Sequence, residues 1–320
     1  MYSRWFSATV VILWLATMGW LVEEKVLPLM LVGEPPSVGK VIESQRRKPV
    51  VGWHISFGDR SLGWALTETK LLSSGLTEIR GRVRFDSLPV EALSHGWLQP
   101  LSRLVGKSMD KLQLDTRSLL TVESLGHLVH FDCVVRLDPW DEVFTAHGIV
   151  EGSRMRLQLR VRSNGFEQTI PEQLLPLPTN ALVSDVFSPQ PQTEMPGLRL
   201  GQTWTVPIYS PFSPDKNRLE ILRATVEESQ RIPWNGDFTQ TWLVVYRSES
   251  EGTAGGKAKV RGRVWIRRDG AVLKQEMQIP IIGSTISFER MSDNEAAAKA
   301  KAAGRHWWTP PENAWMGRHD

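Results

Sequence analysis

The sequence of 320 residues contains a single cysteine, Cys133. One cysteine forms no intramolecular disulfide, so a hydrophobic core has to hold the fold, and a chain of this length is long enough to bury one. Because Cys133 lies in the apolar run HFDCVVRL, we expect a buried thiol and not a nucleophile or a metal ligand. No cysteine occurs close to the N-terminus, which excludes a lipoprotein-type lipid attachment there.

Common catalytic motifs are also missing. The sequence has no H-E-x-x-H, no G-x-S-x-G, no P-loop and no dinucleotide glycine fingerprint. Of its histidines only His127 and His130 are close together, and a spacing of three puts them on opposite faces of a strand, where they share no metal ion. We therefore predict no metal, no cofactor and no enzymatic activity, with an enzyme of unrecognised site as a remaining alternative.

Charge gives no sign of a nucleic-acid partner. The isoelectric point is about 9.0, but the formal net charge is only +3. A balance this small does not by itself predict binding to a polyanion such as DNA or RNA.

The N-terminal run, residues 5–22 (WFSATVVILWLATMGWLV), carries no charged side chain. As a helix it would span roughly 27 Å, close to the hydrocarbon thickness of a bilayer. The run predicts a transmembrane anchor over residues 1–24 and a single-pass membrane protein whose main part is exported. A cleaved signal peptide is the alternative, because the small residues around Ala16 form a weak cleavage pattern.

From Val50 onward the hydrophobic period is two. In residues 154–162 (RMRLQLRVR), for example, apolar side chains alternate with arginines, as in a strand with one buried face. Turn signals follow each run at the spacing of a meander. The pattern predicts a mainly β fold, with antiparallel meander sheets curled into one or two half-barrels. Residues 88–106 break this period with a helical spacing, which predicts a short helical insertion.

The same patterns divide the chain into segments. After the anchor we expect a juxtamembrane linker over 25–49, a first β half over 50–170 and a second over 198–291. A Pro- and Gln-rich connection, 171–197, is expected to cross between the two half-sheets. A flexible tail follows over 292–320; it opens with a helix-prone stretch ending at Gly304, and its tryptophans are candidate anchors.

Two stretches suggest a family. Residues 53–64 read W-x-I-x-F-G-D-R-x-L-G-W, and residues 198–208 read L-x-L-G-Q-T-W-T-V-P-I. They resemble the β-rich bacterial envelope domains of unknown function that occur alone or ahead of transglutaminase-like modules. The resemblance implies a half-barrel and supplies no catalytic residues. The Cys-His-Asp triad of the transglutaminase module has no counterpart in this chain.

Two surfaces are candidate binding sites. Arginines on the polar strand faces predict a surface for anionic lipid, polysaccharide or an acidic protein, unless carboxylates of adjacent strands neutralise them. These are Arg80, Arg82, Arg84, Arg154, Arg156, Arg160, Arg162, Arg261 and Arg263. Tryptophans are candidates to line an apolar groove, with 88–106 as its lid; they are Trp53, Trp64, Trp97, Trp204 and Trp242.

The first functional hypothesis is a membrane-anchored, exported, non-enzymatic structural or interaction module of a bacterial envelope. Its partners would be the membrane and a lipid or an envelope protein. The alternative is a carrier that holds a lipid or another hydrophobic ligand in the groove of a curled sheet.

Overall fold

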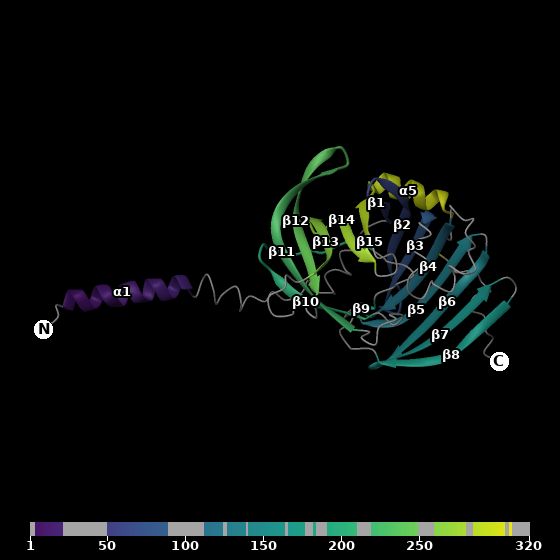
Figure 1. Ribbon diagram of the computed structural model, residues 1–320, viewed down its shortest axis with the longest axis horizontal. Helices are drawn as coiled ribbons and strands as arrows, with labels where there is room; N and C mark the ends of the chain where they lie inside the picture. Colours follow the sequence, from purple (N-terminus) through teal and green to yellow (C-terminus); the bar gives the residue numbers. More distant parts are fainter. Residues whose placement is uncertain are drawn as a thin grey trace.

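The computed structural model describes residues 4–21, 50–88, 112–123, 127–138, 140–163, 166–176, 182–183, 191–209, 219–248, 259–279, 284–304 and 307–308. Within these ranges the chain forms one large curled sheet and two helices, α1 (Arg4–Leu21) and α5 (Asp293–Ala302) (Figure 1). The predicted helical insertion, beyond Leu88, lies outside the described residues, as do the predicted linker and Trp97.

The sheet has fifteen strands within the described ranges. Those of the first half are β1 (Val51–Phe57), β2 (Arg60–Leu71), β3 (Thr77–Leu88), β4 (Leu112–Val122), β5 (Leu128–Asp138), β6 (Trp140–Glu151), β7 (Arg154–Ser163) and β8 (Phe166–Pro176). Those of the second half are β9 (Leu182–Val183), β10 (Thr203–Tyr209), β11 (Leu219–Trp234), β12 (Asp237–Ser248), β13 (Val260–Arg267), β14 (Val272–Ile279) and β15 (Ser284–Arg290).

Pairing of β1 with β15 joins the two halves into one sheet. Across the sheet the order is β8-β7-β6-β5-β4-β3-β2-β1-β15-β14-β13-β12-β11-β10-β9. Neighbouring strands are antiparallel except β9 and β10, which run parallel. In the part of the chain that is described, the edge strands β8 and β9 do not pair with each other, so the sheet is unclosed. The prediction of a mainly β, antiparallel meander curled into a half-barrel is confirmed.

We call the face that carries Trp53 the inner face and the opposite face the outer face. On the inner face, buried apolar side chains from β1, β2, β3 and β5 and from β10 to β15 form one cluster, which includes Trp53, Ile55 and Phe288. A second cluster continues over β5 to β8 and contains Cys133, which is 1% exposed. The thiol is therefore buried, as predicted.

Residues 191–197 pack along the start of β14. Met195 donates its backbone N–H to the carbonyl of Gly270, and Val272 donates to the carbonyl of Thr193. Beside these bonds, the side chains of Glu194 and Arg290 form a buried ion pair. The end of the predicted Pro- and Gln-rich connection is thus fixed to the second half of the sheet.

Helix α5 packs on the outer face of β1 and β2. Ser292 caps its N-terminus by accepting a hydrogen bond from the backbone of Glu295, and the helix contacts the sheet through Ala296. The approach is close, because a Cβ atom added at Gly52 would lie 2.9 Å from the Cβ of Ala296. The first part of the predicted flexible tail is therefore a docked helix. Trp307, which follows it, is also buried.

The N-terminal prediction needs correction. Among the described residues, no helix is long and apolar enough to cross a membrane. Helix α1 spans 18 residues, but it begins at the charged Arg4 and includes polar Ser7, Thr9 and Thr17. The predicted transmembrane helix is not supported, and the single-pass membrane location is wrong.

Candidate ligand site on the inner face

The predicted tryptophan set is divided between the two faces of the sheet. Trp53 and Trp204 are 0% and 3% exposed and belong to the inner apolar cluster, against which Trp242 packs partly buried. Trp64 instead lies on the outer face beneath α5. The reason is the register of the β1–β2 hairpin, which places Trp64 opposite His54 and not opposite Trp53. Trp64 therefore does not belong to an inner groove.

Within the described ranges, three polar groups of the inner face have no hydrogen-bond partner. They are the indole Nε1 of Trp53 and the hydroxyls of Thr67 and Thr116. Their residues are 0%, 5% and 0% exposed. An indole N–H is a donor only, and a buried donor without a partner costs about 1–3 kcal/mol. Groups of this kind call for an acceptor that the protein itself does not supply.

The strand register gathers these groups over β1 to β4. Trp53 lies opposite Ala65, Ala65 opposite Val83, and Val83 opposite Thr116, so all four side chains share one row. With neighbouring strands about 4.8 Å apart, the row from Trp53 to Thr116 spans roughly 14 Å of backbone. The polar groups of Trp53 and Thr116 therefore lie close enough for one elongated ligand to pass both.

The adjacent row contains the third group. Thr67 lies opposite Gly81, and Gly81 lies opposite Ser118 of β4. Small side chains and hydroxyls thus replace large apolar side chains in this part of the inner face. Threonine and serine at positions whose strand alternation is otherwise apolar were a visible signal for it, but only the tryptophans were predicted as site residues.

A phenol and an ion pair also lie near the inner face. Burial raises the pKa of Tyr246, which packs against the inner cluster, so its phenol stays protonated at neutral pH. Arg290 is neutralised by Glu194. The polar groups that face the cluster therefore suit hydrogen bonding to an uncharged molecule better than acid–base chemistry.

The predicted arginine surface lies on the outer face and is largely neutralised by carboxylates. Arg80 pairs with Glu78 at 2.7 Å, Arg82 with Asp115 at 2.5 Å and Arg84 with Asp86 at 2.9 Å. Further along the sheet the same holds for Arg156 with Glu151, for Arg160 and Arg162 with Glu167, for Arg261 with Glu220 and for Arg263 with Glu276. Arg154 is exposed at the start of β7.

These contacts favour the alternative of ordinary surface charge over an anion-binding field. Several of the carboxylates come from the same strand or from the neighbouring strand. Some arginines also have a structural role. Arg80, for example, stacks on the ring of Trp308, 3.7 Å from its centroid, and so fastens the segment that follows α5. An anionic partner for this face stays a prediction.

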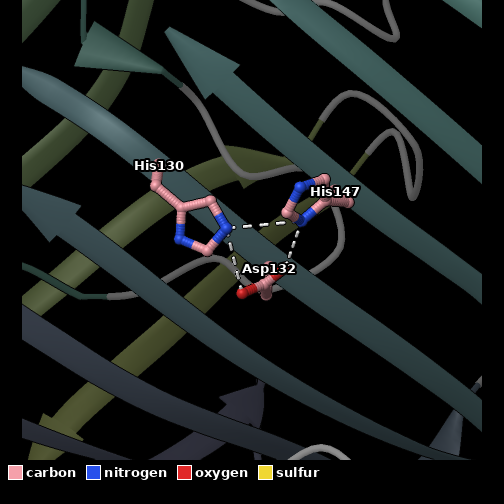
Figure 2. Close-up of side chains that lie close together, drawn as sticks. All are labelled: His130, Asp132 and His147. Atoms are coloured by element: carbon pink, nitrogen blue, oxygen red, sulfur yellow. Dashed lines mark hydrogen bonds and ion pairs between the residues drawn. The ribbon is translucent and has the colours of Figure 1, made fainter. Parts of the chain in front are cut away.

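The two neighbouring histidines separate as expected, but one of them joins an unexpected cluster. His127 contacts Glu123, whereas His130 meets Asp132 and His147 on the outer face (Figure 2). Burial lowers the pKa of His130; Asp132 raises it and His147 lowers it further. Asp132 and His147 were not predicted as site residues. The H-x-D spacing was a visible signal, but His147 enters only through the pairing of β5 with β6.

Comparisons with known proteins give a weak similarity. No family model matches the chain, and no curated protein matches it. Among solved structures it is similar to a β-barrel-like protein of the domain of unknown function DUF1849 from Brucella abortus. The TM-score is 0.44 at 12% identity, covering 76% of this chain and 95% of that chain. It is also similar to LprF from Mycobacterium bovis, with a TM-score of 0.16 at 6% identity, covering 81% and 94%.

Similarities at this level carry no argument about function. The link to transglutaminase-like modules stays a prediction.

Proposed function

We propose that the protein is a non-enzymatic binding protein that holds an uncharged, largely apolar molecule against the inner face of its sheet. The observation that carries this proposal is the set of unpartnered polar groups of Trp53, Thr67 and Thr116 inside an apolar cluster. A ligand oxygen that accepts the hydrogen bond of one of these groups would remove part of a cost that the unliganded protein bears. The ligand class is therefore an apolar chain with one acceptor group, such as an acyl ester.

The energetics favour a bound acceptor. Each unpartnered buried group costs about 1–3 kcal/mol, and a protein of this kind is stable by only about 5–15 kcal/mol. The apolar surroundings supply most of the affinity for the chain of the ligand, at about 0.8 kcal/mol for each buried methylene. The donors then select a molecule that carries an oxygen over a pure hydrocarbon.

The test compares two fluorescent probes that differ only in the acceptor. A pyrene-labelled acyl methyl ester and a pyrene-labelled alkane of equal length are titrated into the full chain. The variants are Trp53→Phe and Thr116→Val, which remove the polar groups and keep most of the volume. Trp265→Phe is the matched control, because its indole lies on the outer face and already donates to Gln230.

The inner variant whose polar group meets the ester is expected to weaken ester binding about fivefold and to leave alkane binding unchanged, since one hydrogen bond contributes about 1 kcal/mol. The unliganded Thr116→Val variant is expected to unfold at the same temperature as the wild type or higher, because no hydrogen bond is lost. Trp53→Phe should unfold at a lower temperature, because it leaves a cavity in the core. The control should bind both probes as the wild type does. Equal affinity for the ester in wild type and inner variants would mean that the groups bind water, and the proposal would fail.

The role as a structural module of a bacterial envelope rests on no contact within the described residues and stays a prediction.

A further inference from the structure

A second site lies on the outer face, where β5 and β6 pair. His130 and Asp132 are two residues apart on β5, so their side chains point to the same side. His147 of β6 lies directly opposite Asp132 in the register. The three side chains therefore converge from two strands, as Figure 2 shows.

The three groups direct their potential ligand atoms at one another. His147 Nδ1 is 2.7 Å from Asp132 Oδ1, His130 Nε2 is 3.3 Å from Asp132 Oδ2, and the two imidazole nitrogens are 3.3 Å apart. Each imidazole thus faces a different oxygen of the same carboxylate. An ordinary hydrogen-bonded pair of Asp132 and His147 does not require the third side chain to point to the same place.

These separations fit the coordination sphere of a small divalent ion. Ligands about 2.0–2.1 Å from a tetrahedral Zn²⁺ are about 3.3–3.4 Å from one another. Two of the three closest approaches have this length. The imidazoles face different oxygens of Asp132, and with one ligand atom from each residue the three atoms lie within 4.8 Å of one another, so they would draw closer around an ion. The third, between His147 and Asp132, is a hydrogen bond, and it would widen by about half an ångström when the ion replaces the shared proton.

The donor set also selects the class of ion. Two neutral imidazoles and one carboxylate suit Zn²⁺ and its neighbours in the first transition row, whereas Ca²⁺ and Mg²⁺ require oxygen ligands. Asp132 is 8% exposed, and the two histidines are only partly buried. The carboxylate is therefore held in place while one side of the cluster stays open to solvent.

The surrounding charges do not oppose a cation strongly. On β7, Gln158 lies opposite His147, and the flanking Arg156 and Arg160 lie opposite Ile149 and Thr145. These two arginines are paired with carboxylates of their own, Glu151 and Glu167. The charge of Asp132 is therefore available to an ion.

We propose that His130, Asp132 and His147 bind one Zn²⁺ ion on the outer face, with the fourth coordination position open to water. Three protein ligands and one open position distinguish this arrangement from a closed structural zinc site. The proposal goes beyond ligand binding on the inner face and does not depend on it.

Isothermal titration of the full chain with Zn²⁺ tests the proposal. The variants are Asp132→Asn and His147→Gln, which lie on different strands, so that one remains informative if the other does not fold. His127→Asn is the matched control. His127 lies three residues before His130 and also contacts a carboxylate, that of Glu123. Thermal unfolding of the metal-free variants establishes that they fold.

We expect one Zn²⁺ per chain, an affinity at least 10-fold lower in each cluster variant, and no change in the control. Zn²⁺ should raise the unfolding temperature of the wild type and of the control only. Co²⁺ bound in its place should give the absorption bands of tetrahedral coordination, and excess Ca²⁺ or Mg²⁺ should not displace it. Equal Zn²⁺ binding by wild type and both cluster variants would overturn the proposal, as would an equal loss of binding in the control.

Discussion

The buried ion pair between Glu194 and Arg290 should be one of the polar contacts whose disruption costs most stability. Their side chains are 2% and 4% exposed, and the guanidinium Nη1 lies 3.3 Å from the carboxylate. The same nitrogen also donates to the carbonyls of Thr193 and Val272. The pair thus connects residues 191–197 to both β14 and β15.

Replacement of Glu194 by glutamine leaves the guanidinium of Arg290 buried without its counter-charge. Removing one partner of a buried pair costs about 3–5 kcal/mol, because the remaining charge keeps its full desolvation penalty. For a domain of this size, 1 kcal/mol corresponds to about 2–4 °C in unfolding temperature. The Glu194→Gln variant is therefore expected to unfold about 6–20 °C below the wild type.

The matched control is an exposed pair of the same kind. Asp86→Asn breaks the contact between Asp86 and Arg84. Their side chains are 54% and 36% exposed, respectively. Such a pair contributes about 0–1 kcal/mol, since water solvates both charges after the contact is lost. Differential scanning calorimetry of both variants gives the comparison.

A double variant separates the lost attraction from the stranded charge. In Glu194→Leu with Arg290→Met neither charge remains, so the protein should regain part of the stability that Glu194→Gln loses. The recovery is expected to be incomplete, because two backbone carbonyls then lack the Arg290 donor. If Glu194→Gln costs no more than Asp86→Asn, the reasoning about this pair is refuted.

Two further predictions concern alkaline pH and a close backbone contact. Burial raises the pKa of Tyr246 in the folded protein. In the unfolded chain the phenol has its ordinary pKa of about 10 and therefore ionises at a lower pH. Stability should therefore fall as the pH rises above about 10, and Tyr246→Phe should remove part of this slope in urea titrations; an unchanged slope would contradict it. A Cβ atom added at Gly63 would lie 1.9 Å from the backbone oxygen of Arg84. Gly63→Ala should thus cost about 3 kcal/mol in urea unfolding. At Gly58 an added Cβ meets nothing within 4 Å, so Gly58→Ala should cost only about 1 kcal/mol; equal costs would refute the steric argument.

Local alternation was sufficient to predict the strands. In β7, Met155 and Leu157 are buried on the inner face while Arg154 is exposed, as the period of two requires. The helix-prone stretch before Gly304 is also helical. These features depend only on residues close together in the chain, and such patterns are visible in a sequence.

The pairing register of the strands is not visible in the sequence, and the wrong placement of Trp64 follows from it. A shift of one residue in pairing moves a side chain to the other face of a sheet. The β1–β2 hairpin is irregular between Ile55 and Ser56, and its register puts Trp64 on the face opposite to Trp53. The docking of α5 likewise depends on Gly52, which lies about 240 residues before the helix in the chain. The anchor prediction is a separate case, since no helix among the described residues is long and apolar enough to cross a membrane.

Strand β5 contributes side chains to both faces of the sheet. Its odd-numbered side chains, such as Phe131 and Cys133, enter the inner apolar cluster, while His130 and Asp132 point outward. The ligand groups on the inner face lie over β1 to β4, beside the register of β5 and β6 that would hold the ion. Because Zn²⁺ would fix that register, it should raise the unfolding temperature without changing the affinity for an acyl ester. A change in ester affinity on adding Zn²⁺ would show instead that the two faces are coupled through β5.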